Sequence, residues 1–237
     1  MKRILLLASL CAASAFAAAP DERCIARVDV ADLPLVVLQA KKTSDQFAVM
    51  LTGDGGWRRI DDKVTDKLRD EGVPVVGFLT PDYFHTRRTA AESACALERV
   101  IRFHQIQWKR RKVILIGYSR GADVLPFMAS RLPSDIRPSV SAIALLGLEP
   151  TSDFRYHPSW IPFVHWREPQ FPVAPEVEKL RGQKVLCFFG EKEKHSICRT
   201  LDPSLVTAVH ERGSHHFAGN YRGIAETILA ATAAGSN

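Results

Sequence analysis

The residues best suited to covalent chemistry lie where an apolar run stops at a glycine-rich turn. Gly117-Tyr118-Ser119-Arg120-Gly121 reads G-x-S-x-G and follows a β-branched, apolar stretch from Val113 to Gly117. In a nucleophile elbow the serine occupies a strained turn between a strand and a helix, and the flanking glycines leave room for the crowded backbone. The pattern of residues Gly121 to Arg131 is typical of the helix that follows. We therefore predict that Ser119 is a nucleophile, the alternative being an ordinary strand-to-helix turn.

Two adjacent histidines are candidates for the base that a serine nucleophile requires. His215 and His216 lie in a loop before the predicted last helix, which is the place of the histidine when the chain order is Ser, acid, His. A Gly-x-x-His-Phe arrangement favours His216 as the general base, with His215 as a neighbour that orients substrate or caps the loop. Two surface histidines are the alternative. Because a base must be neutral, we expect activity to rise through about pH 6 to 7.

Two glutamates are candidates for the carboxylate that orients the base. Glu191 and Glu193 follow a late apolar strand that ends at Phe189, and the acid of such a triad usually stands three residues after a glycine such as Gly190. This spacing favours Glu193 over Glu191. A solvated charged turn is the alternative.

A second glycine-rich segment, Gly53-Asp54-Gly55-Gly56, follows an early predicted strand. Its backbone can approach a reacting carbonyl closely, so we predict an oxyanion hole made by the N–H of Asp54 or Gly55 and the N–H of Arg120. A phosphate-binding loop is the poorer interpretation, because the lysine and hydroxyl residue of that motif are missing.

Strands and helices alternate along the chain, which predicts an α/β fold with a mostly parallel sheet and helices on both faces. We expect one α/β-hydrolase domain over residues 18–237. The predicted strands are Gln46 to Thr52, Val73 to Leu79, Val113 to Gly117, Val140 to Gly147, Lys184 to Phe189 and Ser204 to His210, after an extended piece from Arg27 to Ala40. The predicted helices are Arg58 to Glu71, Thr89 to His104, Gly121 to Arg131 and Tyr221 to Ala234.

The alternation breaks between Pro150 and Pro175, where six prolines and six aromatic residues make regular structure unfavourable. A long irregular loop in a compact domain is commonly functional. We interpret residues 150–175 as a lid-like loop, with a loop that only plugs the core as the alternative.

The N-terminus predicts export. A basic start, a short apolar run and a small-residue end make residues 1–17 a signal peptide, so we expect an exported protein. Removing Lys2 and Arg3 lowers the formal net charge from +6 to +4, and no run of like charge suggests a nucleic-acid partner. This mild charge is compatible with peripheral contact with an anionic membrane.

The four cysteines outside this segment are an even number in an oxidising compartment, which favours disulfides over metal ligation. Spacing favours a bridge between Cys187 and Cys198, which leaves Cys24 with Cys95. Such a bridge would bracket Glu193 and fix its loop. No metal or cofactor is expected.

Several ordered motifs together resemble the VirJ/AcvB family of exported bacterial α/β-hydrolases. The resemblance covers about residues 45–232 and implies a periplasmic serine hydrolase that cleaves the aminoacyl ester of lysyl- or alanyl-phosphatidylglycerol, with Ser119 as nucleophile and His216 as base. Longer relatives carry an extra N-terminal domain. The motifs are LTGDGGW from Leu51, Tyr83-Phe84 with Arg87-Arg88-Thr89, GYSRGADVLPF from Gly117, LLGL from Leu145, Cys187 with Cys198, and GSHHFAGNY from Gly213.

The implied substrate assigns further roles at a membrane surface. Asp54 would meet the cationic amine, and Arg87 or Arg88, with Tyr83 nearby, would hold the phosphate. The aromatic loop would dip into the headgroup region. Two alternatives stay open: a secreted esterase or peptidase of other specificity, and a non-catalytic accessory that binds secreted proteins or a secretion apparatus.

Overall fold

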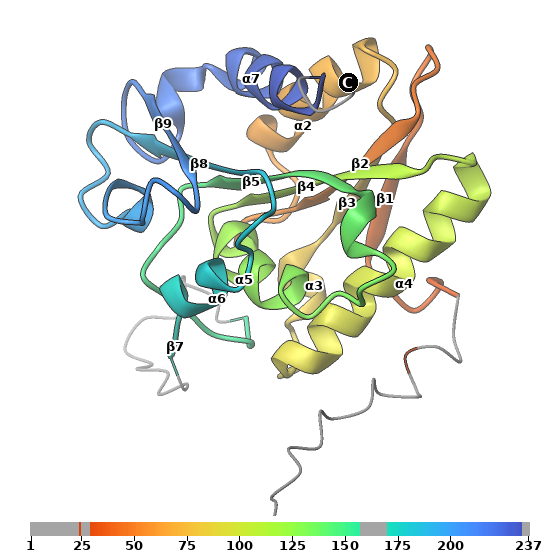
Figure 1. The fold of residues 1–237 in the computed structure, drawn as a ribbon, viewed down its shortest axis with the longest axis horizontal. Helices are drawn as coiled ribbons and strands as arrows, with labels where there is room; N and C mark the ends of the chain where they lie inside the picture. Colours follow the sequence, from red (N-terminus) through yellow and green to blue (C-terminus); the bar gives the residue numbers. More distant parts are fainter. Residues whose placement is uncertain (1–23, 25–28, 157–169, 234–237) are drawn as a thin grey trace, which may run out of the picture.

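The structure is a computed structural model that describes residue 24 and residues 29–156 and 170–233 (Figure 1). The predicted signal peptide lies outside these residues, as do residues 157–169 of the predicted lid-like loop. Within the described ranges, none of the helices is both long enough and apolar enough to span a bilayer.

Seven strands form one sheet in the order β1-β3-β2-β4-β5-β8-β9. β1 is antiparallel to β3, and all other neighbouring pairs in this sheet are parallel. The strands are β1 (Leu35–Leu38), β2 (Gln46–Leu51), β3 (Val75–Phe78), β4 (Lys112–Tyr118), β5 (Val140–Leu146), β8 (Val185–Gly190) and β9 (Thr207–Glu211).

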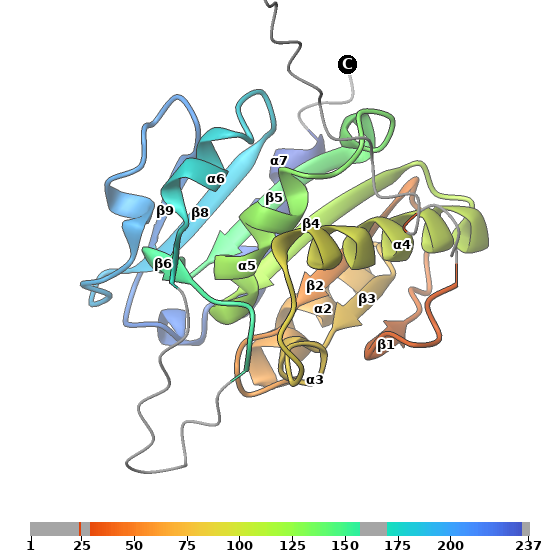
Figure 2. The same cartoon turned by 90° about the horizontal axis from the view of Figure 1, so that it is seen from below.

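Helices cover both faces of this sheet (Figures 1 and 2). One face carries α2 (Arg59–Asp70) and α7 (Tyr221–Ala233), and the other carries α4 (Ala90–Trp108) and α5 (Arg120–Ala129). The short helices α3 (Thr80–Tyr83) and α6 (Ala174–Glu178) lie on the side of α4 and α5. The predicted α/β fold with a mostly parallel sheet and helices on both faces is confirmed.

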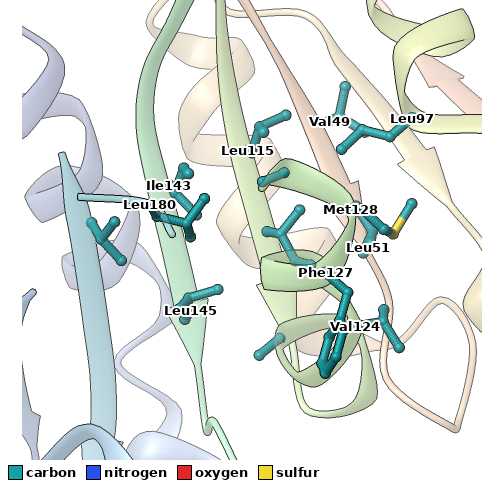
Figure 3. Close-up of a cluster of buried hydrophobic side chains, with 14 of the residues drawn as sticks. Val49, Leu51, Leu97, Leu115, Val124, Phe127, Met128, Ile143, Leu145 and Leu180 are labelled. Carbon is teal, nitrogen blue, oxygen red and sulfur yellow. The ribbon is translucent and has the colours of Figure 1, made fainter. Parts of the chain in front are cut away.

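The central strands are apolar on both sides because both faces are covered. Along β4, Val113 and Leu115 belong to the cluster under α4 and α5, whereas Ile114 and Ile116 belong to the cluster under α2 and α7. Successive side chains of a strand point to opposite faces, so one buried strand contributes to two cores. Figure 3 shows the first cluster, in which helix and strand side chains meet, among them Leu97, Val124, Phe127, Met128, Val49, Leu51 and Leu115.

α4 extends further than the sequence pattern predicts. Its start is as expected, because Thr89 caps it: Thr89 Oγ1 accepts the N–H of Glu92 at 3.1 Å, and the Glu92 carboxylate accepts the N–H of Thr89 at 2.7 Å. The predicted end at His104 is wrong, since the helix continues to Trp108. Trp108 packs edge-on against Phe47 of β2 at 5.6 Å between ring centroids, so a tertiary contact holds the last turn.

The expectation of no regular structure over residues 150–175 is wrong at both ends of this segment. β6 (Thr151–Ser152) and β7 (Phe171–Pro172) form a small antiparallel sheet, and α6 follows. Pro172 is tolerated because both strands of a two-stranded sheet are edges, and Pro175 stands in the first turn of α6, where no N–H is needed.

Both predicted disulfides are present, Cys24 with Cys95 and Cys187 with Cys198. Cys95 lies in α4. Cys187 lies in β8, and Cys198 lies in a short 3-10 helix, Ile197–Arg199, so the second bridge closes the loop that contains Glu193.

Replacing Cys187 and Cys198 together with Ala should lower the free energy of unfolding by about 2 to 3 kcal/mol, because the unfolded chain regains the freedom of a short loop. It should also lower the activity of the folded fraction, since Glu193 loses its anchor. The matched control is Cys24→Ala with Cys95→Ala, which should cost stability but leave activity per folded molecule unchanged. Urea denaturation and an ester assay check both; unchanged activity in the first variant would contradict a role of this bridge in holding the acid.

Candidate active site

Ser119 occupies the turn between β4 and α5 with φ 54° and ψ −125°, outside the usual regions for a residue with a side chain. Two glycines make this turn feasible. A Cβ on Gly121 would lie 2.2 Å from the Leu51 carbonyl oxygen, and one on Gly117 would lie 2.4 Å from the Gly121 carbonyl oxygen. The N–H of Ser119 donates to the Leu146 carbonyl at 2.8 Å. This is the geometry of a nucleophile elbow.

Glu193 and His215 form a hydrogen-bonded pair. Nδ1 of His215 lies 2.5 Å from Oε1 of Glu193, and the other carboxylate oxygen accepts the N–H of Gly190 at 2.6 Å. Burial alone would raise the pKa of Glu193, but the bonds from His215 and Gly190 outweigh it and hold this pKa below its ordinary value. The carboxylate is therefore ionised at neutral pH, and it orients the ring so that Nε2 is the nitrogen left for chemistry.

His216 was predicted to be the partner of the acid, but it contacts Tyr118 instead of Glu193. Its Nδ1 lies 3.0 Å from the Tyr118 hydroxyl, and its side chain is exposed. The sequence interpretation assigned the pair to the wrong histidine because neighbouring residues of a loop point in different directions. Glu191, the second candidate for the acid, is also elsewhere, since its carboxylate accepts the N–H of Gly213 at 3.1 Å.

Ser119 and His215 line the same cavity, which has a volume of about 520 Å³. The His215 ring lies against Gly147 at the end of β5, where a Cβ would come within 2.6 Å of Cε1. The elbow at the end of β4 and the histidine loop after β9 thus meet at the carboxyl edge of the sheet. The other lining residues are Gly53, Asp54, Gly55, Gly56, Arg58, Arg59, Ile60, Tyr118, His216 and Tyr221.

The predicted oxyanion loop borders this cavity. Residues 53–56 form a tight turn in which the N–H of Gly56 donates to the Gly53 carbonyl at 3.0 Å. Within the part of the chain that the structure describes, the N–H groups of Asp54 and Arg120 donate to no other residue. Asp54 lines the cavity and Arg120 directly follows Ser119, so these two N–H groups lie unbonded at and next to the cavity wall.

Arg120 fastens this loop to its surroundings. Its guanidinium pairs with the Asp54 carboxylate, and its Nη1 lies 2.8 Å from Oδ1 of Asp153 just after β6. The exposed Asp54 carboxylate thus already has a cationic partner, which argues against its predicted role in meeting a substrate amine. The same arginine ties the oxyanion loop, the nucleophile elbow and the start of the predicted lid-like loop together.

The bacterial virulence protein family VirJ matches residues 45–235 of the chain, which is most of its length. The chain belongs to the VirJ family. No curated protein sequence matches it.

Solved structures similar to this VirJ-family chain share its fold at low identity. Est1E from Butyrivibrio proteoclasticus is 14% identical, with a TM-score of 0.59, over 86% of this chain and 97% of that one. MenH from S. aureus is 13% identical, with a TM-score of 0.60, over 84% and 98%. A monoacylglycerol lipase from Paleococcus ferrophilus is 13% identical, with a TM-score of 0.55, over 84% and 100%. These similarities establish the α/β-hydrolase fold.

Arg87 and Arg88, predicted to hold a substrate phosphate, do not line the cavity of Ser119. They line a separate cavity of about 530 Å³. Cζ of Arg88 lies 4.9 Å from the centroid of the Tyr83 ring, and the backbone N–H of Arg88 donates to the Phe154 carbonyl at 2.9 Å. Tyr83, predicted to contact substrate, is buried, and its hydroxyl donates to the Glu92 carbonyl at 3.2 Å. The prediction assigned these residues to the substrate because the implied substrate carries a phosphate, whereas α3 directs this segment to the α4 side of the sheet.

The sequence interpretation missed Arg58 and Arg59, which the VirJ-family fold brings into the cavity of Ser119. A signal was available, because two arginines directly follow the predicted oxyanion loop and Trp57. Tyr118 was also missed; its hydroxyl contacts the His215 carbonyl at 3.3 Å as well as His216.

One buried carboxyl near this cavity should make stability depend on pH. Asp61, in the first turn of α2, is fully buried; Oδ2 accepts the N–H of Arg58 at 2.8 Å, and Oδ1 has no hydrogen-bond partner among the described residues. Burial raises the pKa of Asp61 from 3.8 to about 7. Between these values the folded protein holds a proton that the unfolded chain has lost, so stability falls as pH rises through this window.

Asp61→Asn should therefore raise the free energy of unfolding at pH 8 by about 2 to 4 kcal/mol, because it removes a buried charge and keeps an acceptor for Arg58. Near pH 4.5 the substitution should change stability little, since the native carboxyl is already protonated there. Urea denaturation at the two pH values checks this, and an equal effect at both would contradict it.

Proposed function

We propose that this VirJ-family protein is a serine ester hydrolase in which Ser119 is the nucleophile, His215 the general base and Glu193 the residue that orients the base. The observation that carries the proposal is the 2.5 Å contact between Glu193 and His215, because His215 lines the same cavity as the strained Ser119. A serine hydroxyl becomes a competent nucleophile in this constellation.

The steps follow from the positions of these groups. Nε2 of His215 takes the proton of Ser119 as Oγ attacks the ester carbonyl, and the resulting oxyanion accepts the N–H of Arg120 and the N–H of Asp54 or Gly55. Collapse of the intermediate breaks the ester bond, and His215 gives its proton to the leaving alcohol. Water, activated by the same histidine, then hydrolyses the acyl-enzyme and frees the acid.

The proposed substrate is the aminoacyl ester of lysyl- or alanyl-phosphatidylglycerol, as the motifs shared with the VirJ/AcvB group suggest. Hydrolysis would release the amino acid and restore the anionic lipid. The proposed place is the periplasm: residues 1–17 read as a signal peptide, and two disulfides suit an oxidising compartment.

The test is hydrolysis of lysyl- and alanyl-phosphatidylglycerol by the purified mature protein and by Ser119→Ala, with a soluble p-nitrophenyl ester in parallel. The proposal expects amino acid release that is lost in the variant. Turnover of the soluble ester alone would retain the nucleophile and remove the lipid substrate. If neither substrate is turned over, the hydrolase proposal fails and the accessory function gains support.

A further inference from the structure

We propose that Arg58 and Arg59 form an anion-binding subsite of the Ser119 cavity, which holds a phosphate group that the substrate carries close to the scissile ester. The inference deepens the proposed function and rests on it for the role of Ser119. It replaces Arg87 and Arg88, which the sequence suggested for this task.

The two arginines are placed beside the predicted oxyanion loop. Both line the cavity that contains Ser119 and His215. Arg58 lies along the loop itself, since a Cβ on Gly55 would come 2.9 Å from Nε of Arg58. An anion bound by these guanidinium groups therefore lies in the same cavity as the carbonyl that Ser119 would attack.

The segment before the arginines is held in place by packing. The Trp57 ring lies against Gly77 of β3, where a Cβ would approach the ring to 2.2 Å, and Nε1 of Trp57 donates to Asp62 of α2 at 2.6 Å. The backbone N–H of Arg58 is fixed by Asp61. Because the backbone on both sides is anchored, the guanidinium groups start from a defined position at the cavity wall.

The charge of Arg58 favours the ionised form of the nearby Asp61, although the two side chains form no ion pair. Among the described residues, neither Arg58 nor Arg59 has a side chain in an ion pair, although both are exposed to solvent. The nearby acids are otherwise engaged: Asp54 pairs with Arg120, Asp62 accepts from Trp57, and Asp61 is buried and accepts from backbone. The N–H donors of both guanidinium groups are therefore available to a ligand, and guanidinium groups bind phosphate oxygens with charge-assisted hydrogen bonds.

The cavity lined by Arg87 and Arg88 has a different character. Its walls include Phe127, Phe154 and Phe171, and Arg131 on its rim is already paired with Glu176 at 2.7 Å. Among the described residues, the two cavities share no lining residue. A phosphate bound there would lie in a different cavity from the ester that Ser119 attacks.

The kinetic test compares two matched esters, 1-acetylglycerol and 1-acetylglycerol 3-phosphate, which differ only in the phosphate. The double variant Arg58→Gln/Arg59→Gln should raise KM for the phosphorylated ester at least about tenfold, and should leave the neutral ester within about twofold. The matched control, Arg87→Gln/Arg88→Gln, should change KM by the same factor for both esters. Equal effects of Arg58→Gln/Arg59→Gln on the KM of both esters would overturn the subsite. A control variant that raises KM more strongly for the phosphorylated ester than Arg58→Gln/Arg59→Gln does would overturn it too.

A binding test separates this inference from the hydrolase proposal. Ser119→Ala should bind glycerol 3-phosphate by calorimetry, and adding Arg58→Gln/Arg59→Gln should weaken the Kd at least about tenfold, with circular dichroism to check folding. Binding that is unaffected by these substitutions overturns the subsite even if the enzyme is active. Loss of binding supports it even if no ester is hydrolysed. Binding of inorganic phosphate but not of glycerol 3-phosphate would show a site for the free ion and overturn the substrate role.

Discussion

Replacing His215 with Ala is expected to lower kcat/KM for ester hydrolysis by about 10⁴-fold or more. His215 is bonded to the ionised Glu193 through Nδ1, so Nε2 is free to take the proton of Ser119. Without a base the serine attacks only as a neutral hydroxyl, and removal of the histidine of a triad has effects of this size. Because the loss lies in the chemical step, it should appear in kcat.

The matched control for this prediction is the neighbouring residue. His216→Ala removes an exposed imidazole that contacts Tyr118 and leaves the pair of Glu193 with His215 intact. We expect kcat/KM to fall by less than about tenfold, because His216 is not bonded to Glu193 and is not the proposed base. A large loss in His216→Ala together with a small loss in His215→Ala would restore the interpretation made from the sequence and contradict the structure.

Glu193→Gln should lower kcat by about 10³ to 10⁴-fold while the protein stays folded. The amide has the shape of the carboxylate, but it has no charge to stabilise the imidazolium, and its NH₂ group can enforce the wrong tautomer of His215. The measurement is single-turnover hydrolysis of a soluble ester, which separates chemistry from binding.

Glu191→Gln is the control for the acid. Glu191 follows the same strand but accepts the N–H of Gly213, and no hydrogen bond joins it to either histidine in the described part of the chain. We expect full activity within about threefold. Comparable losses in the two variants would show that general electrostatics of this loop, and not the contact with His215, accounts for the effect.

Periodicity and turn chemistry predicted much of the fold. The elbow was found because Gly117 and Gly121 flank a serine between a buried strand and a helix. This turn depends on residues that are neighbours in the sequence, so the sequence pattern was enough to predict it. The core strands were found because β2 and β4 are apolar after their first residues, Gln46 and Lys112. The end of α4 was not, because Trp108 is held by Phe47, a residue distant in sequence.

The difference between local signals and contacts distant in sequence also explains which residues of the candidate site were predicted. Ser119, Glu193 and the predicted oxyanion loop each follow a strand, and parallel strands end at one edge, so chain order was sufficient to bring them together. The choice between His215 and His216 depends on which way each side chain leaves the loop, and a sequence pattern contains no such direction. Arg87 and Arg58 present the same difficulty, because each follows a strand closely but only Arg58 lies in the cavity of Ser119.

The most direct measurement of the central claim is labelling with a fluorophosphonate, followed by peptide mass spectrometry of the wild type, His215→Ala and His216→Ala. Such a reagent reacts with a serine that its base has activated. We predict an adduct on Ser119 in the wild type and in His216→Ala, and none in His215→Ala. An adduct on another residue, or labelling that persists in His215→Ala and disappears in His216→Ala, would contradict the triad of Ser119, His215 and Glu193.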